Sequence, residues 1–527
     1  MHNSFIENMQ KTADGMNPNV SVTENGAVGY ETTGKALLDL NFKLSSMRNW
    51  TEDKIWNEFL HAYNENPVLS VVWLFFARDV RGGTGERRTF RVIFKRLAYE
   101  NPELAIKLLR FVPEYGRWDD VVDVFCGDAP CKVRDAALNL IKKQWHDDVF
   151  AYNNNGNVSL MAKWLPSENT SSNKTCGNAS KVRTALGYTS RDYRRIISRL
   201  RKRIDVTEQK MSANQWGDIS YESVPSKAGL LYHNAFVRHD GHRYQEYLSD
   251  VASGKAKMNS DTLFPYEIVH AYMCDDYWVD SDLKPYDETL ELKWKNLPNS
   301  VKNGGDTLVV VDGSGSMSSR VGKTSITCHD VARSLGIYFA ERLSGPFKNS
   351  FITFSSSPKV VKFVGVNSLR SKLEILIGED DCSNTDIEKT FDLILKTAVD
   401  NNLKQEDLPS NVLIVSDMEF DSLKRSYGWE WPWHGTHHPV DERLFDAIKK
   451  KFDGHGYKLP RLVFWNVCSR SETIPVTENE LGVALVSGFS PSIADMVMSG
   501  EIDPWKALVN KLRSERYAPV FAAVMRT

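Results

Sequence analysis

The sequence has 527 residues, of which 41% are hydrophobic and 11% aromatic, so it can bury the cores of two or three globular domains and is not a disordered chain. Its net charge of -2 at pH 7 excludes any argument for nucleic-acid binding from overall charge, although basic residues cluster locally. No apolar run approaches the roughly 18 residues of a membrane span, no secretory signal opens the chain, and the seven cysteines are scattered. We therefore expect a cytoplasmic protein with free thiols and no membrane partner.

The first 295 residues of the chain are predicted to form a lead-in followed by a helical region. Residues 1–33 are polar and show little periodicity, which predicts a mobile N-terminus. From residue 33 to about 150, apolar residues recur three and four apart in segments that end at Asn-Pro, Gly or Pro, and we assign residues 34–295 to the helical domain. Successive helix pairs of this kind predict an α-solenoid or a similar all-helical array.

One connector of this array, residues 78–91, carries five arginines around three glycines. Clustered guanidinium groups and close backbone approach are what a phosphate needs, so the connector is a candidate RNA contact. A helix-helix turn whose arginines pair with Asp79 and Glu86 is the alternative. The candidate residues are Arg78, Arg81, Arg87, Arg88 and Arg91.

A second basic stretch, residues 181–203, has nine Lys or Arg against one acid, Asp192. Its apolar residues fall at helical spacing after Thr189 or Ser190, which predicts a capped helix with one buried and one cationic face. An anionic partner would offset the repulsion between these cations, whereas a merely solvated face is the alternative. The candidate RNA contacts are Arg191, Arg194, Arg195, Arg199, Arg201, Lys202 and Arg203.

Residues 221–255 interleave aromatic and basic side chains, the composition that stacks and neutralises single-stranded RNA. Packing of these aromatic rings in a core is the alternative. The rings include Tyr221, Phe236 and Tyr244.

From residue 296 to 500 strands and helices alternate, which predicts a doubly wound α/β domain, and residues 501–527 add a helix and tail. The fold class is therefore an all-helical domain followed by a doubly wound domain. Strands are predicted at 307–311, 350–354, 359–364, 411–415, 461–467 and 482–487, and helices at 325–343, 368–377, 386–399, 441–452 and 503–514.

The first of these strands ends in the sequence DGSGS, which places Asp312, Ser314 and Ser316 in a glycine-rich turn. A carboxylate and two hydroxyls at the carboxyl end of a parallel strand suit a hard divalent cation such as Mg2+. Two later loops add Thr385 and Asp417. A tight turn capped by Asp and Ser is the alternative for the first motif alone.

Residues 422–440 form a loop that contains three Trp and three His and follows the Asp417 strand. An exposed aromatic loop beside a metal predicts a contact surface. A loop folded onto its own domain is the alternative, and a second metal at His434, His437 and His438 is a weaker hypothesis.

The pattern of Asp312, Ser314, Ser316, Thr385 and Asp417 resembles the metal-ion-dependent adhesion site of von Willebrand factor A domains. A helical array joined to such a domain resembles the TROVE proteins, the Ro autoantigen and its relatives, through the short motifs at 82–88 and 113–121. The resemblance is closer still to a TROVE-like family without an assigned function. It implies a ring that binds small structured or misfolded RNAs and a metal site in the second domain.

The first functional hypothesis is therefore an RNA-binding scaffold with a Mg2+ site. The second is a metal-dependent assembly module, in which an acidic side chain of a protein partner completes the coordination, without nucleic acid. No Ser/His/Asp or Cys/His pattern and no phosphate loop stands out in the sequence, so we expect no enzyme activity.

Overall fold

The computed structural model describes residues 19–274, 283–301, 305–354, 357–379, 385–422, 443–494, 496 and 500–525. The chain forms two compact units, each built from segments far apart in the sequence. The first unit comprises Met1–Thr51, Phe264–Tyr286 and Asn299–Lys511, and the second comprises Glu52–Leu263, Asp287–Pro298 and Leu512–Thr527. This division differs from the predicted boundaries at residues 34, 296 and 501.

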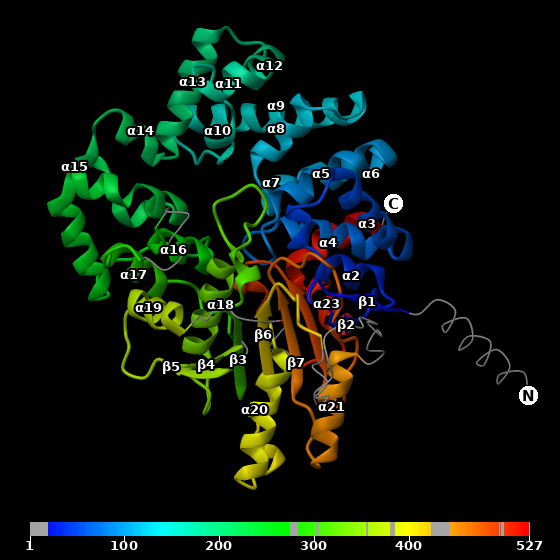
Figure 1. The fold of residues 1–527 in the computed structure, drawn as a ribbon. Helices are drawn as coiled ribbons and strands as arrows, with labels where there is room; N and C mark the ends of the chain where they lie inside the picture. The colour runs from blue at the N-terminus through cyan, green and yellow to red at the C-terminus, as the bar shows by residue number, and fades with distance from the viewer. Residues whose placement is uncertain are drawn as a thin grey trace, which may run out of the picture. The chain divides into compact units, whose positions relative to one another are not determined.

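The first unit is organised around a mostly parallel sheet, which in the described part of the chain has six strands in the order β5-β4-β3-β6-β7-β8 (Figure 1). All neighbours pair in parallel except β4 and β5. The strands are β3 (Thr307–Asp312), β4 (Ser350–Phe354), β5 (Lys359–Lys362), β6 (Asn411–Ser416), β7 (Arg461–Asn466) and β8 (Val483–Ser487). The central strands are continuous apolar runs because helices cover both faces of the sheet.

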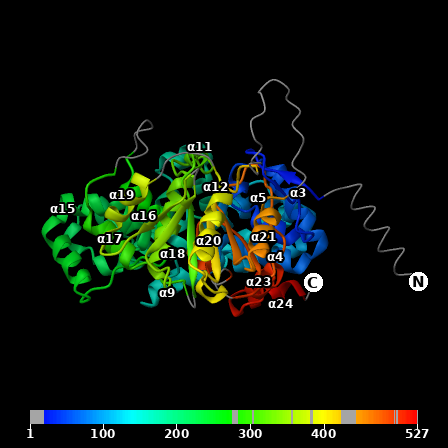
Figure 2. The ribbon, with the colours of Figure 1, turned by 60° about the horizontal axis from the view of Figure 1, so that its bottom comes forward.

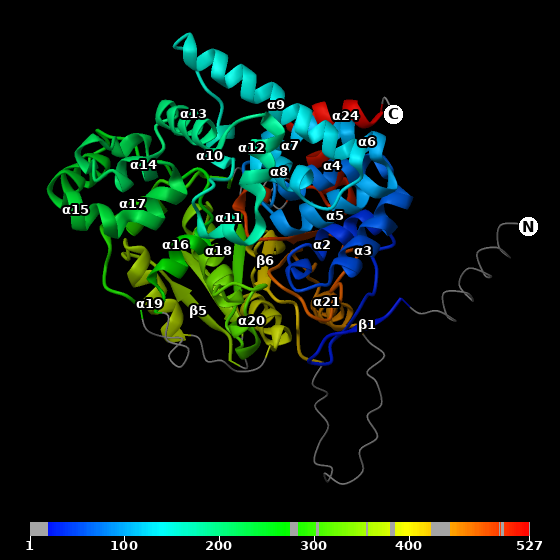
Figure 3. The same cartoon turned by 90° about the horizontal axis from the view of Figure 1, so that it is seen from above.

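Helix α18 lies on one face of this sheet, and α20 and α21 lie on the other (Figure 3). Helix α18 begins at a capping box, in which the Thr327 hydroxyl accepts the Asp330 N–H and the Asp330 carboxylate accepts the Thr327 N–H. Within its described residues, this unit has the helices α2 (Ala36–Phe42), α16 (Pro265–Tyr272), α18 (Cys328–Arg342), α19 (Leu369–Glu379), α20 (Ile387–Asp400), α21 (Leu444–Gly454) and α23 (Pro504–Leu512), with 3-10 turns η1 (Ser46–Arg48), η5 (Gly315–Ser318), η6 (Gln405–Asp407) and η7 (Pro491–Ile493).

Segments outside the predicted α/β region complete the first unit. Helix α2 packs on β8, and α16 packs on α18. The short strands β1 (Ser21–Val22) and β2 (Val28–Gly29) pair with each other, and the Thr23 hydroxyl between them donates to the Phe420 carbonyl at 2.6 Å. Residues 19–33, which were predicted to be mobile, are thus anchored on this unit.

The second unit is helical. Two of its helices begin at an Asn-Pro pair, in which Asn66 or Asn101 caps the helix and the proline takes the first helical position. In the described residues its α-helices are α3 (Glu52–Glu65), α4 (Pro67–Arg78), α5 (Arg87–Glu100), α6 (Pro102–Leu108), α7 (Val112–Tyr115), α8 (Trp118–Cys126), α9 (Cys131–Asn153), α10 (Met161–Trp164), α11 (Ser171–Cys176), α12 (Asn178–Leu186), α13 (Ser190–Arg203), α14 (Thr207–Ser212), α15 (Ser226–Ala252), α17 (Glu288–Lys295) and α24 (Ala518–Met525). Its 3-10 turns are η2 (Leu109–Phe111), η3 (Trp216–Asp218), η4 (Tyr221–Ser223) and η8 (Glu515–Tyr517).

Helices distant in sequence pack together in this unit. Helices α15 and α17 lie side by side (Figure 2), and α24 packs on α4 and α6. Buried Asp79 fixes the C-terminal segment, because its carboxylate accepts hydrogen bonds from the Arg516 guanidinium and the Tyr517 hydroxyl.

The two units together confirm the predicted combination of a helical region and an α/β region with a mostly parallel sheet. None of the helices in the described residues is both long and apolar enough to span a bilayer.

Candidate metal centre

The predicted metal residues begin where two neighbouring strands end. Strand β3 ends at Asp312, and Asp417 directly follows β6. The two strands pair in parallel, with Val311 beside Val415, so both carboxylates leave the sheet at the same edge.

The loop after β3 folds its side chains back toward Asp312. The Ser314 N–H donates to Asp312 Oδ1 at 2.9 Å, and the Ser416 hydroxyl donates to Asp312 Oδ2. The Ser314 and Ser316 hydroxyl oxygens lie 3.0 Å apart. These contacts bring the oxygens of the predicted first motif together with a hydroxyl from the end of β6.

The two carboxylates are almost completely buried, since Asp312 is 1% exposed and Asp417 is 0% exposed. Burial, and next the charge of Asp417, raises the pKa of Asp312. Burial also raises the pKa of Asp417, against the nearby guanidinium of Arg470 and the facing hydroxyl of Ser316. The folded protein thus holds two adjacent carboxylates in an environment that disfavours their charged forms.

Asp417 Oδ2 is buried and accepts no hydrogen bond within the described residues. Arg470 Nη1 lies 3.2 Å from this oxygen as an ion pair but does not donate a hydrogen bond to it. The same guanidinium donates through Nε to Glu24 Oε2 at 2.8 Å and through Nη1 to the Ser319 hydroxyl at 3.3 Å. Asp417 therefore keeps one buried acceptor that the protein leaves incompletely satisfied.

Thr385 is buried beside the segment that follows Asp417. Its carbonyl accepts the Asp421 N–H at 3.1 Å, and its hydroxyl accepts an N–H of the Asn25 side chain at 2.8 Å. Asn25 also donates to the Glu419 carbonyl at 2.6 Å. The structure thus joins Asp312, Ser314, Ser316 and Asp417 in one cluster and places Thr385 on the Asp417 side of it, with its hydroxyl turned toward Asn25.

The sequence analysis missed Asn25, Glu419 and Arg470. Glu419 is fully buried; its Oε1 accepts the N–H groups of Arg470 and Ser471 at 2.7 and 2.8 Å, and its Oε2 accepts the Glu24 N–H at 2.9 Å. Glu419 could have been identified from the sequence, because it is a second acid two residues after Asp417 at the end of an apolar strand. Nothing local identifies Asn25 or Arg470, because both reach this edge from distant segments.

A small divalent cation fits this set of donors. The described residues contain no group of three or more His, Cys, Asp and Glu side chains that could hold a metal by themselves. Asp312 and Asp417 supply two carboxylates, so hydroxyls and water would have to complete the coordination shell of the cation. A hard divalent cation such as Mg2+ accepts such oxygen ligands. The buried Oδ2 of Asp417, which accepts no hydrogen bond within the described residues, is the atom that a bound cation would satisfy.

The arginines of connector 78–91 are largely used inside the helical unit. Arg78 is 5% exposed and donates to Asp120 through Nε at 3.0 Å and Nη2 at 2.7 Å, so its prediction as an RNA contact is wrong. Arg87 pairs with Asp119, and Arg91 donates to Asp120 at 2.7 Å. These three arginines thus pair with acids of α8, so the connector is an ion-paired turn.

Arg81 and Arg88, the remaining arginines of the connector, are exposed. Packing explains why this turn contains glycine. A Cβ at Gly83 would lie 1.8 Å from the Phe76 carbonyl oxygen, so the close backbone approach is internal to the turn.

Helix α13 has the two faces predicted for residues 181–203. Thr189 caps it by accepting the Asp192 N–H, and Tyr193, Ile197 and Leu200 are buried. Arg201 is an exception to the predicted cationic face, because its guanidinium turns inward and donates to Ala162 O, Leu165 O and Ser167 Oγ. Its prediction as an RNA contact is wrong. The exposed cations are Arg191, Arg194, Arg195, Arg199, Lys202 and Arg203.

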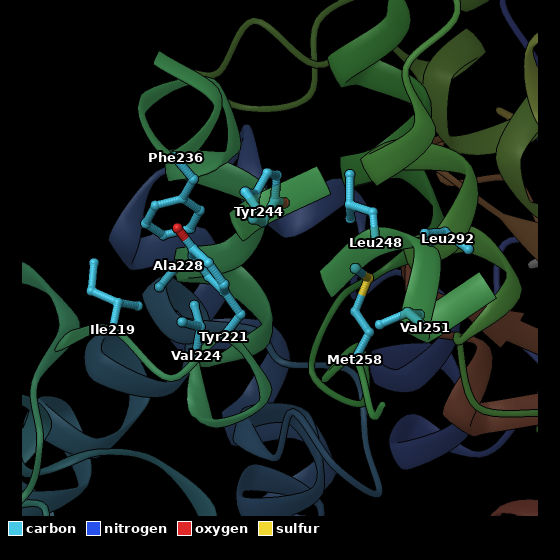
Figure 4. Close-up of a cluster of buried hydrophobic side chains, with 10 residues drawn as sticks. All are labelled: Ile219, Tyr221, Val224, Ala228, Phe236, Tyr244, Leu248, Val251, Met258 and Leu292. Carbon is cyan, nitrogen blue, oxygen red and sulfur yellow. The ribbon is translucent and has the colours of Figure 1, made fainter. Parts of the chain in front are cut away.

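Aromatic rings predicted to stack on RNA pack in a core. Tyr221, Phe236 and Tyr244 are buried in one apolar cluster (Figure 4), in which the Tyr221 and Phe236 rings meet edge to face with centroids 5.3 Å apart. Outside this cluster, exposed His239 stacks on half-buried Trp216 with ring centroids 4.3 Å apart. Core packing, the alternative interpretation, therefore holds for these three rings.

The predicted Trp/His loop at 422–440, with His434, His437 and His438, lies outside the described residues apart from its first residue. Its predictions as a contact surface or a second metal site stay predictions.

Comparison with known proteins finds two domain families and one relative. Residues 306–516 match a domain of unknown function, DUF7788, and residues 162–307 match another, DUF2828. "Uncharacterized protein L728" of Acanthamoeba polyphaga mimivirus is 30% identical over 539 residues, which cover 95% of this chain and 89% of the viral protein. None of these descriptions mentions a TROVE or von Willebrand factor A domain, so that resemblance stays a prediction. The chain belongs to the same family as this mimivirus protein, with its DUF7788 match on the α/β unit that carries the candidate metal centre.

Proposed function

We propose that this protein binds a divalent cation, Mg2+ by its preference for oxygen ligands, and uses it to hold a carboxylate of a protein partner. The cation would be held by Asp312, Ser314, Ser316, Thr385 and Asp417, as in von Willebrand factor A domains. The buried, unsatisfied Oδ2 of Asp417 beside buried Asp312 is the observation that supports the proposal most directly.

Charge supports the same conclusion. The Arg470 guanidinium is the cation that pairs with this cluster; it lies 3.2 Å from Asp417 Oδ2 and also pairs with Glu24. Two carboxylates against one guanidinium leave a net negative charge in a buried site, which a divalent cation would neutralise. Two carboxylates and the neighbouring hydroxyls do not fill an octahedral shell, so a position remains for an external Asp or Glu.

Binding of Mn2+ to the full chain, followed by electron paramagnetic resonance and competed with Mg2+, tests the cation site. Asp312→Asn should abolish tight Mn2+ binding, whereas Asp446→Asn, which changes an exposed acid of α21 in the same unit, should leave it intact. Equal Mn2+ affinity of the wild type and Asp312→Asn would refute the proposal.

A second candidate function, RNA binding by a scaffold of Ro type, is supported by the exposed face of α13. Six cations share this surface, and Asp192, which pairs with Arg195 at 3.5 Å, is the one acid in the helix. Guanidinium groups on a helical face suit phosphates. The HEAT-like, ring-forming character expected from the TROVE resemblance belongs to this proposal. Buried Arg78, Arg201 and the aromatic cluster no longer support it, so it ranks second.

Filter binding of a single-stranded 20-nucleotide RNA across a salt series tests this function. Joint replacement of Arg194 and Arg195 by Ala should weaken binding and lower the salt slope by roughly 1 to 1.5, at about 0.7 per lost phosphate contact. Joint replacement of Lys396 and Lys404 by Ala removes the same charge from exposed positions of the other unit and should change little. No binding at low salt would remove the RNA hypothesis.

A further inference from the structure

Three side chains of the first unit form a chain of hydrogen bonds that the sequence does not reveal. His270 Nε2 lies 2.9 Å from the Ser325 hydroxyl oxygen, and His270 Nδ1 lies 2.9 Å from Asp330 Oδ2. Ser325 is exposed, the His270 side chain is 27% exposed, and the Asp330 side chain is 4% exposed. The order from solvent to interior is therefore hydroxyl, imidazole, carboxylate.

The direction of these bonds follows from the chemistry of the groups. An ionised carboxylate can only accept, so Nδ1 carries the imidazole proton and Nε2 is left as an acceptor. Nε2 then accepts the Ser325 hydroxyl proton. This is the nitrogen assignment that a serine nucleophile needs, with the base in hydrogen-bond reach of the hydroxyl and oriented by a carboxylate behind it.

Rigid elements hold each of the three groups. His270 lies on α16, which packs on α18, and Asp330 lies in the first turn of α18, where its carboxylate also accepts the Thr327 N–H at 3.1 Å. Ser325 lies in a tight hairpin closed by the bridge between Arg320 and Thr327 and by the Val321 N–H to Ile326 O bond of 2.9 Å. The serine is thus fixed two residues before the residue that caps α18.

Donors for an oxyanion are also present in this hairpin. No hydrogen bond within the described residues occupies the backbone N–H of Thr324 or Ser325. An N–H of the nucleophile itself and one beside it are the kind of donors that stabilise the oxygen of a tetrahedral intermediate.

We propose that Ser325, His270 and Asp330 form a second functional site, one that transfers or hydrolyses acyl groups and is independent of the proposed metal and RNA sites. The Ser325 oxygen forms a bond to the acyl carbon while its proton moves to His270 Nε2. The bond from the acyl carbon to the leaving group breaks, and the leaving group takes that proton. Water, deprotonated in turn by His270, then releases the acid and restores the serine.

The exposure of Ser325 indicates the class of substrate. A hydroxyl at the surface of a hairpin suits an ester or thioester carried by a larger molecule and presented to the protein, because such an acyl group is reached from outside. His270 is the base, and Asp330 is a positioning residue that acts through His270.

Labelling of the full chain with a fluorophosphonate probe, located by mass spectrometry, tests the proposal. The Ser325 oxygen would form a bond to phosphorus as fluoride leaves, and the proton would pass through His270 to solvent. Label on the peptide that contains Ser325 should fall at least tenfold in Ser325→Ala and in His270→Ala. Ser198→Ala, which removes an exposed helical serine of the other unit, should leave it unchanged.

A second measurement separates positioning from folding. With p-nitrophenyl acetate as the probe substrate, Asp330→Asn should lower kcat at least tenfold with KM unchanged, and circular dichroism should show the wild-type helix content. An unlabelled Ser325 in the wild type, or label that survives in His270→Ala, would overturn the proposal and leave these residues as a structural tether of the hairpin.

Discussion

Replacement of Asp312 by Asn tests the physical basis of the candidate metal centre. Asn has the shape of the protonated acid, so it can keep the bond from the Ser314 N–H through Oδ1 and can donate to the Ser416 oxygen in place of accepting from it. The change therefore removes one buried negative charge and little else. In the absence of metal, we expect the variant to be more stable than the wild type.

The size of this gain depends on pH. Burial and the charge of Asp417 raise the pKa of Asp312 in the folded state above its unfolded value of about 3.9. An acid with a raised pKa binds its proton more tightly when folded, so wild-type stability falls as pH rises through the folded pKa. The pKa of Asp312 rises to about 7. Because each unit of rise corresponds to about 1.4 kcal/mol, the gain at a pH above that value should be at least about 2 kcal/mol.

Differential scanning calorimetry in a chelator measures the difference. A gain of about 2 kcal/mol should raise the unfolding temperature of this unit by roughly 4–8 °C at about pH 8, and the gain should vanish near pH 4. Saturating Mg2+ should then raise the wild-type unfolding temperature at about pH 8 and leave that of Asp312→Asn unchanged. A variant that is destabilised equally at both pH values would refute the reasoning.

Three further changes probe buried polar and glycine positions. Burial lowers the pKa of Lys293 to about 8, so Lys293→Met should stabilise the helical unit by on the order of 2 kcal/mol at neutral pH, measured by urea unfolding, and the gain should shrink as pH rises toward about 10.5. Gly83→Ala should prevent folding of that unit, seen as lost helical circular dichroism, because its Cβ would overlap the Phe76 carbonyl oxygen. Glu419→Ala should lower the free energy of unfolding by about 3–5 kcal/mol, measured by calorimetry, because it leaves three backbone N–H groups without their acceptor.

Matched changes control each of these results. Gly217→Ala adds a Cβ where nothing lies within 4 Å, and Glu480→Ala removes an exposed acid, so both should be nearly neutral. Lys257→Met removes an exposed cation of the helical unit and should not show the pH-dependent gain. Destabilisation by Lys293→Met at neutral pH, a folded Gly83→Ala or a neutral Glu419→Ala would each contradict the packing described above.

Sequence reasoning found the sheet and the cluster of Asp312, Ser314, Ser316 and Asp417 because both depend on local patterns. A buried apolar strand followed by polar residues recurs at Asp312 and at Asp417, and parallel pairing forces such strand ends to one edge. The same reasoning could not find Asn25 or Arg470. They reach this edge through the hairpin β1–β2 and the loop after β7, and no local pattern specifies those contacts.

The basic connector shows the opposite outcome. Arg78 and Arg91 stand among glycines and look free to bind phosphate, and the sequence analysis weighed only the neighbouring acids Asp79 and Glu86 as partners. Their actual partner, Asp120, lies 42 and 29 residues later in the first turn of α8. A buried ion pair between helices that are distant in sequence cannot be predicted from the residues around only one of its two partners.

The link between His270 and Ser325 was missed for a related reason. His270 was assigned to the helical domain, 55 residues before the serine, whereas its helix packs on α18 in the α/β unit. Only the assignment of α16 to that unit brings the imidazole to the hairpin.

The interleaving of the two units along the chain constrains how the protein is made. Strand β8 of the α/β unit needs α2, which is synthesised more than 400 residues earlier, and α24 of the helical unit packs on α4, which also precedes it by more than 400 residues. Neither core can therefore be completed on a nascent chain until these late segments have been synthesised, so both units would mature together. A fragment that ended or began at residue 296 would contain neither unit in full.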